Sequence, residues 1–253
     1  MRHRQPAICL RASDYSETSQ VVAFLTRAEG VVRLLAKGTK RPKSKSGGAI
    51  DLLSEGDLVF TLGRSGGLGT LVEFTETVSH TPLRRQAGRL SAALYVIELA
   101  GEMLAPDDPH PEVFDLLHNA LARLAQEDAP IPAVVAYFQW RLLRNVGLLG
   151  ELGRCIGCGA RISTAGGQRG LRFSSTRGGM LCATCGNQGG ESVGVSGETA
   201  AALAALAAAE TGRKVTLGDD QAERVKGLLS YHITYQLGKC LKLARHVISP
   251  KRT

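Results

Sequence analysis

The sequence contains no apolar run long enough to span a membrane and no secretory signal. Its longest apolar stretch, residues 200–209, is mostly alanine, whereas a helix that crosses a bilayer needs about 20 apolar residues. The basic start, residues 1–6, is not followed by the apolar segment that a signal peptide requires. We therefore expect a cytoplasmic protein without membrane contact, in a compartment where thiols stay reduced.

Motifs of common enzyme classes are also missing. The sequence has no G-x-x-x-x-G-K-[ST] loop to cradle the phosphates of ATP and no H-E-x-x-H pair for a catalytic zinc. The glycine run at residues 66–69 is too short for a dinucleotide fingerprint. We therefore predict no catalytic residues and no enzymatic activity.

The charge is strongly basic and unevenly distributed. Of the 253 residues, 43% are hydrophobic and 21% charged, which is typical of a globular protein, and the net charge is +8. Residues 1–80 carry 11 basic and 8 acidic groups, residues 81–212 carry 11 and 12, and residues 213–253 carry 9 and 3. The two basic ends predict a polyanionic partner.

Residues 6–80 show the pattern of short β-strands. Residues 21–26 and 31–37 are rich in β-branched side chains, and Glu29 and Gly30 suit a hairpin turn between them. About five such strands in so short a segment favour an oligonucleotide-binding (OB) barrel. The alternation predicts these inward-facing residues: Val32, Leu34, Ala36, Leu58, Phe60, Leu62, Val72 and Phe74.

A basic loop, residues 37–48, follows the second of these strands. Its glycines and proline exclude regular structure. Because the alternation turns Arg33 outward on the adjoining strand, we predict a phosphate-binding surface rather than a solvated run of charge. Its predicted members are Arg33, Lys37, Lys40, Arg41, Lys43, Lys45 and Arg64, and Arg11 and Arg27 would widen it.

The rest of the chain is predicted to be helical around a glycine-rich insertion. From residue 83 the apolar spacing predicts three successive helices, the third of which ends at Gly147. A long closing helix is predicted at residues 219–247. Residues 147–197 hold 15 of the 30 glycines and four of the six cysteines. We therefore predict an α+β protein with an N-terminal OB-fold barrel (1–80), a helical domain (81–150 and 196–253) and an embedded four-cysteine zinc module (151–195).

Four cysteines form two C-x-x-C-G motifs, Cys155 with Cys158 and Cys182 with Cys185. The spacing lets both thiolates of a pair face one ion, and the glycine that follows permits the tight turn. Four sulfurs make a closed tetrahedral site, which predicts one structural Zn²⁺ rather than a redox pair or a catalytic metal. The other two cysteines, Cys9 and Cys240, are predicted to be small buried residues.

Further basic residues cluster near the C-terminus. Lys239 and Lys242 recur with Arg245 and His246 on one side of the predicted closing helix. They would either offset the helix dipole or contact DNA directly, and both interpretations stay open. None of the histidines has ligand spacing, so they are interpreted as surface or packing residues: His3, His80, His110, His118, His232 and His246.

Several segments, in collinear order, resemble the RecO family of bacterial DNA repair proteins. They are residues 11–17, 22–27, 36–44, 63–71 and 235–242, and the cysteine pairs fall where the family has its zinc module. Gln236 stands where the family's C-terminal motif often has a histidine. The resemblance extends over nearly the whole chain.

This resemblance implies a recombination mediator associated with the nucleoid. Such a protein binds single- and double-stranded DNA and anneals strands without ATP. With RecR, and with RecF as a further partner, it exchanges single-strand-binding protein (SSB) for RecA. The family also docks the acidic C-terminal tail of SSB in its helical domain. Because a buried carboxylate must be paired, we expect Arg141 or Arg144, beside Tyr137 and Trp140, to bind that tail.

Two other functions stay open. An OB barrel with a zinc ribbon also suits a transcription or RNA-binding factor, which an assay for annealing of SSB-coated strands would distinguish from a mediator. A nuclease or other metal hydrolase is disfavoured by the closed four-sulfur site and by the lack of clustered carboxylates. A nuclease assay with Mg²⁺ would test that alternative.

Overall fold

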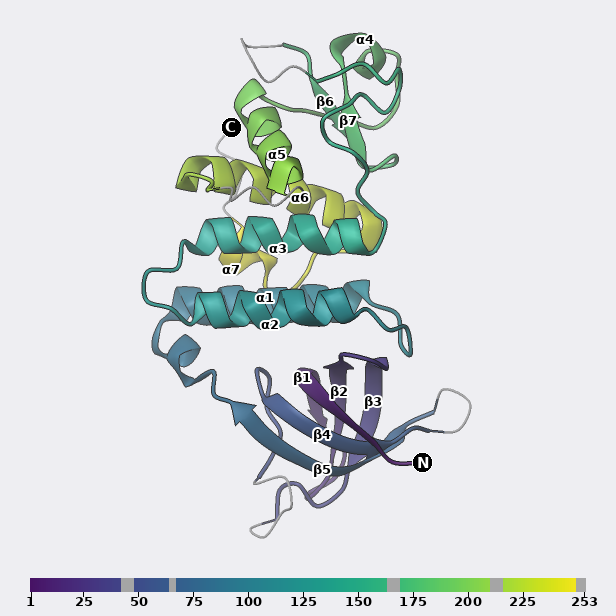
Figure 1. Cartoon of the computed structure of the whole chain (residues 1–253), viewed down its shortest axis with the longest axis vertical. Helices are drawn as coiled ribbons and strands as arrows, with labels where there is room; N and C mark the ends of the chain where they lie inside the picture. Colours follow the sequence, from purple (N-terminus) through teal and green to yellow (C-terminus); the bar gives the residue numbers. More distant parts are fainter. Residues whose placement is uncertain (42–47, 64–66, 163–168, 210–215, 249–253) are drawn as a thin grey trace. The chain divides into compact units, whose positions relative to one another are not determined.

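The computed structural model describes residues 1–41, 48–63, 67–162, 169–209 and 216–248 (Figure 1). The chain divides into two compact units, Met1–Ala129 and Pro130–Thr253. The first contains the N-terminal barrel and two α-helices, and the second contains the remaining helices and the cysteine-rich segment. No helix in the described part of the chain is both long enough and apolar enough to cross a membrane.

Five strands of the first unit form a closed barrel with the order β1-β2-β3-β5-β4. β1 pairs antiparallel with both β2 and β4, and a short parallel contact between β3 and β5 closes the barrel. A closed five-stranded barrel is the architecture of the OB fold, so the predicted barrel is confirmed. The strands are β1 (His3–Asp14), β2 (Gln20–Thr26), β3 (Gly30–Ala36), β4 (Glu55–Thr61) and β5 (Gly69–Val78).

The barrel core follows the predicted alternation along β3. The three predicted inward residues of this strand are buried, while Arg33 and Lys37 are exposed. Leu58 and Phe60 of β4 are also buried as predicted. Leu62 is not: it lies one residue beyond the end of β4, where the alternation no longer holds, and it is 44% exposed.

A β-bulge changes the inward-facing set of β5. The pairing with β4 shifts after Val59, so that Phe60 faces Leu71 rather than Val72. Because an extra residue reverses the alternation, Leu71 and Phe74 are buried and Val72 is only half-buried. The prediction that Val72 faces the core is therefore wrong.

The helices of the first unit follow the barrel in sequence. Two helices pack against each other, and the second of them buries an apolar face. This second helix begins at a proline, whose fixed φ suits a first helical turn. The helical elements are the 3₁₀ helix η2 (Thr81–Arg85), α1 (Ala87–Met103) and α2 (Pro111–Leu124).

The second unit is built on α3 (Ile131–Asn145) and α6 (Asp219–Leu237), which pack against each other (Figure 1). Trp140 of α3 is 1% exposed, and the buried Gln139 donates to Ser230 Oγ of α6 at 2.8 Å. α5 (Gly197–Ala209) packs on α6 as well. Between α3 and α5 the chain forms β6 (Arg172–Ser174), β7 (Gly179–Leu181), α4 (Ala183–Gly186) and β8 (Val193–Gly194).

The closing helix is shorter than predicted. α6 ends at Leu237 because Gly238 adopts a left-handed conformation with φ of 65°, which is typical of the residue after a helix. A separate short helix, α7 (Ala244–Val247), follows. Lys239 and Lys242 therefore lie in the connection between α6 and α7, not on one side of a continuous helix.

Candidate metal centre and basic face of the barrel

The four predicted cysteine ligands come together in the second unit. The sulfurs of Cys155, Cys158, Cys182 and Cys185 all lie within 4.8 Å of one another. Cys182 is the N-cap of α4, and the first turn of this helix carries Cys185. Four sulfurs in such a cluster can hold a metal ion.

Backbone N–H groups point at these sulfurs. Gly157 and Cys182 donate to Cys155 Sγ at 3.4 and 3.3 Å, and Cys185 donates to Cys182 Sγ at 3.5 Å. Such bonds favour the thiolate form that binds metals. A Cβ atom at Gly157 would lie 2.9 Å from Cys185 Sγ, so the glycine leaves room for the second pair of sulfurs.

The thiols of the cluster have opposite pKa shifts. Burial by itself raises the pKa of Cys155, but backbone hydrogen bonds outweigh it and lower the pKa to about 6. Hydrogen bonds with the sulfurs of Cys158 and Cys182 raise the pKa of Cys185 to about 12. The cluster therefore favours the thiolate form of Cys155 and disfavours ionisation of Cys185, because a second negative charge would lie beside the first. A divalent cation would remove this repulsion, and four sulfur ligands with no open position fit zinc.

The cysteine cluster is joined to a small sheet that contacts α6. The amide of Ile156, inside the first pair, donates to a carbonyl of β7 at 2.9 Å. Phe173 of β6 packs edge-on against His232 of α6, with ring centroids 5.2 Å apart. Gln236 of α6 donates to Ser175 O at 2.8 Å. An ion at the cysteines would therefore support the docking of this sheet on α6.

Four residues of the predicted basic surface lie on and after β3. The members within the described residues are Arg33, Lys37, Lys40 and Arg41, whereas Lys43, Lys45 and Arg64 lie outside them. Lys40 forms an ion pair with the end of β1, its Nζ lying 2.6 Å from Asp14 Oδ1. Arg33 borders a pocket of about 120 Å³ that Leu62 and Gly67 of the β4–β5 connection also line. That volume is smaller than the pockets that hold drug-sized ligands.

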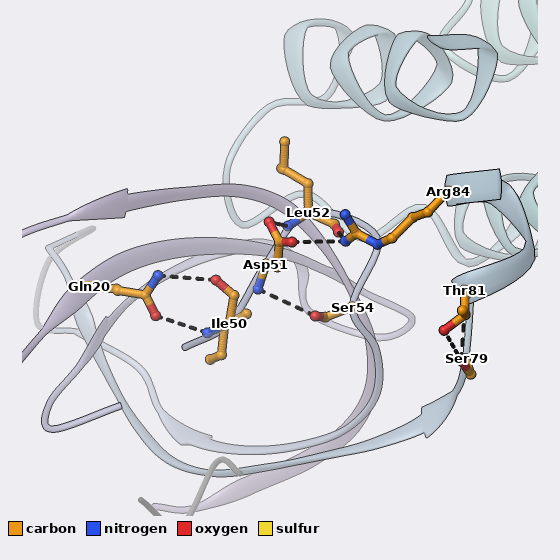
Figure 2. Close-up of polar contacts among 8 residues, drawn as sticks. All are labelled: Gln20, Ile50, Asp51, Leu52, Ser54, Ser79, Thr81 and Arg84. Carbon is orange, nitrogen blue, oxygen red and sulfur yellow. Dashed lines mark hydrogen bonds and ion pairs between the residues drawn. The ribbon is translucent and has the colours of Figure 1, made fainter. Parts of the chain in front are cut away.

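A buried glutamine ties both ends of the basic loop to the barrel. Gln20 Oε1 accepts from Thr39 Oγ1 at 3.0 Å and from the Ile50 amide at 2.9 Å, and Gln20 Nε2 donates to Ile50 O at 3.0 Å. Figure 2 shows the paired bonds between Gln20 and Ile50. Just beyond them, Arg84 of η2 holds Asp51 Oδ2 at 2.8 Å (Figure 2). The loop therefore leaves and re-enters the barrel at fixed points.

Two further arginines of the barrel pair with the helices of the first unit. Arg11 Nη2 lies 3.2 Å from Glu102 Oε1 of α1. Arg27 donates twice to the Asp115 carboxylate of α2, at 2.9 and 3.0 Å. Both arginine side chains are more than half exposed, so the prediction that Arg11 and Arg27 widen the basic surface stays a prediction.

The C-terminal candidates lie in the second unit. Lys239 and Lys242 are exposed. Cys240, between them, is also exposed, so the prediction that it is a small buried residue is wrong, because the helix has already ended at Leu237. Cys9 is buried as predicted, and burial raises the pKa of its thiol to about 12.

The two arginines predicted for a partner tail lie on α3. Trp140 beside them is a core residue, and Tyr137 is 42% exposed. The Arg141 guanidinium lies 5.8 Å from the centre of the Trp140 ring. Arg144 Nη1 donates to Leu149 O at 3.2 Å, which secures the turn after the helix.

Comparison with models of known protein families shows which family the chain belongs to. Residues 1–78 match the model described as Recombination protein O N terminal, and residues 84–245 match Recombination protein O C terminal. The chain belongs to the RecO family. This membership gives it a role in DNA repair.

Relatives in the RecO family align along most of the chain. The chain is 31% identical to the DNA repair protein RecO of Myxococcus xanthus over 95% of both proteins. It is 32% identical to that of Anaeromyxobacter dehalogenans strain 2CP-C over 93% of both. It is 29% identical to that of Salinibacter ruber over 92% of this chain and 87% of the relative.

Sequence reasoning, including the resemblance to the RecO family, missed one polar cluster in the first unit. Glu55 opens β4 and its side chain is 6% exposed. Its carboxylate accepts from His80 Nε2 at 2.8 Å and from His118 Nδ1 of α2. The two histidines are 38 positions apart in the sequence, so no local spacing could indicate that they share an acid.

Proposed function

We propose that this protein is a recombination mediator that performs no bond-breaking chemistry. It binds single- and double-stranded DNA, anneals strands without ATP and helps RecA to replace SSB, together with RecR and RecF. The observation that carries the proposal is the closed barrel whose basic loop is anchored at both ends, in a chain of the RecO family.

The barrel would bind DNA through its phosphates. Exposed cations on and after β3 neutralise phosphates and release counterions, which gives affinity without sequence preference. Annealing then requires only that two strands be held close while their repulsion is screened. The residues proposed for this contact are Arg33, Lys37, Lys40, Arg41, Lys43, Lys45 and Arg64, with Lys239 and Lys242 as a second group.

The metal would be one structural Zn²⁺ bound by Cys155, Cys158, Cys182 and Cys185. The ion would supply four bonds that hold the small sheet in place, and it would leave no position open for water or substrate. We also propose that each predicted domain has its own function. Residues 1–80 would contact DNA and residues 151–195 would bind zinc. The helical segments 81–150 and 196–253 would dock partners.

A partner site for the SSB tail is proposed on α3. Arg141 lies by the ring of Trp140, which also packs against the half-exposed Tyr137. A guanidinium near an exposed aromatic ring suits a peptide that ends in an apolar residue and a carboxylate. Arg144 is the second candidate. Titration of a labelled tail peptide against Arg141→Ala and Arg144→Ala, with naked DNA as the control ligand, would test this site.

The DNA-binding proposal is tested by fluorescence anisotropy over a salt series. Each of Lys37→Gln, Lys40→Gln and Arg41→Gln should weaken binding and flatten the slope of log affinity against log salt by about 0.7 to 0.9. The matched control is Arg4→Gln, which removes one charge at the opposite end of β1 from Asp14. If reversal of all five loop charges, including Lys43 and Lys45, leaves affinity and slope unchanged, the loop does not bind DNA.

A further inference from the structure

The barrel segment contains few aromatic side chains. Residues 1–80 include only Tyr15, Phe24, Phe60 and Phe74. The three phenylalanines belong to the barrel core, where Phe24 and Phe74 pack with ring centroids 5.1 Å apart. Tyr15 is 66% exposed. It is therefore the one tyrosine or phenylalanine ring of this segment that is exposed to a ligand.

Tyr15 lies on a turn that holds itself together without the tyrosine ring. The turn joins β1 to β2, and backbone bonds close it: Tyr15 N donates to Ser19 O at 2.9 Å, and Ser16 N donates to the same oxygen at 3.2 Å. Backbone hydrogen bonds thus fix the position of the residue that carries the exposed ring. Its replacement should cost the fold little, because it buries little apolar surface.

The same turn contacts the start of the basic loop. The amide of Lys40 donates to Thr18 O at 3.3 Å, and the Lys40 ammonium pairs with Asp14, the residue before the tyrosine. Thr39 is buried and bonded to Gln20, the residue after the turn. An exposed ring and a group of cations therefore lie on two adjoining, mutually anchored segments.

We propose that Tyr15 stacks against a base of single-stranded DNA whose phosphates are neutralised by the adjoining Lys40 and Arg41. This inference rests on the proposed DNA binding of the barrel. It identifies the side chain that would distinguish single-stranded from double-stranded DNA. The faces of bases in a duplex are already covered by their neighbours. A free strand offers its bases, so the ring adds affinity for single strands only.

The test compares Tyr15→Ala with Tyr15→Phe in the full-length protein. Labelled oligo(dT) and a duplex of equal length serve as ligands in fluorescence anisotropy. Tyr15→Ala should weaken single-strand binding at least about fivefold, which corresponds to about 1 kcal/mol, and should leave duplex binding and the salt slope unchanged. Tyr15→Phe should restore the affinity, because stacking needs the ring and not the hydroxyl.

An oligonucleotide that carries abasic sites provides the second measurement. The wild type and Tyr15→Ala should bind it equally, since no base remains to stack. Equal binding of oligo(dT) by the two proteins, while Lys40→Gln weakens it, would overturn the stacking site and leave the proposed function intact. Equal weakening for strand and duplex would also overturn it. A wild type that binds neither ligand would refute the proposed function itself.

Discussion

At the residue scale, Glu55 joins three parts of the first unit. Its carboxylate lies between His80, which precedes η2, and His118 of α2. Burial by itself raises the pKa of Glu55, but the hydrogen bonds from His80 and His118 outweigh it and hold the pKa below its usual value. Asp115 and Arg27 form a separate ion pair close to the same histidine. The barrel and its helices thus share a buried, charged contact.

Replacement of this carboxylate should destabilise the first unit. We expect Glu55→Gln to lower the free energy of unfolding by about 2 kcal/mol at pH 7, because two charge-assisted hydrogen bonds become neutral ones. Urea denaturation would measure the loss. The control is Asp57→Asn, which removes the exposed pair with Arg4 and should change the stability by less than about 1 kcal/mol. An equal loss in both variants would contradict a special role for Glu55.

The free energy of unfolding of Glu55→Gln should depend less on acidic pH than that of the wild type. Because the pKa of Glu55 is lower in the folded than in the unfolded chain, its contribution is complete above the unfolded value of about 4.3. That contribution is lost as the pH falls through the folded pKa. The stability difference between the wild type and Glu55→Gln should therefore shrink between pH 5 and pH 3. A difference that stays constant over this range would argue against the shift.

At the element scale, Gln20 anchors the basic loop to β2. Gln20→Met would retain the volume of the side chain but leave the Thr39 hydroxyl and both backbone groups of Ile50 without it as a partner. We expect a loss of about 2 to 3 kcal/mol and faster amide exchange at Ile50. Hydrogen exchange followed by mass spectrometry would detect the local effect.

The control for this substitution is Gln5→Met on β1. Gln5 is only half-buried, so its replacement should change the stability by less than about 1 kcal/mol, which is less than the loss expected for the buried Gln20. If Gln20→Met also weakens DNA binding while Gln5→Met does not, the anchoring of the loop contributes to affinity. Unchanged exchange at Ile50 would contradict the anchoring role of Gln20.

At the scale of the whole molecule, the two units should respond differently to loss of the metal. The purified protein should contain about one zinc per chain by elemental analysis. Chelation should remove exchange protection from Ile156, β6 and β7, because the four sulfurs support that sheet. The strands of the barrel belong to the other compact unit and have their own core, so they should stay protected.

Cysteine variants provide the matched comparison for chelation. Cys158→Ser should reproduce the effect of the chelator, whereas Cys240→Ser should not, because Cys240 is exposed and outside the cluster. Cys158→Ser should lower the free energy of unfolding while its DNA affinity stays close to that of the wild type. A metal-free protein with full protection of β6 and β7 would refute a structural role for the ion.

Much of this protein follows from local sequence patterns. The alternation along β3 predicts its buried and exposed residues, since neighbours two apart share a face. The two C-x-x-C-G motifs predict the cluster of four cysteines because each pair is already close in the chain. Collinear motifs predict the family.

Other features arise only when distant segments pack. The bulge that turns Leu71 inward depends on the pairing of β5 with β4, and the end of α6 depends on the conformation of Gly238. The sharing of Glu55 by two histidines and the bonding of Gln20 to both ends of a loop join residues far apart in sequence. Sequence alone determined the family, the barrel strands and the four-cysteine cluster, because short spacings encode them. Tertiary structure decided which charges are paired and which ring is exposed, because contacts between distant segments set both.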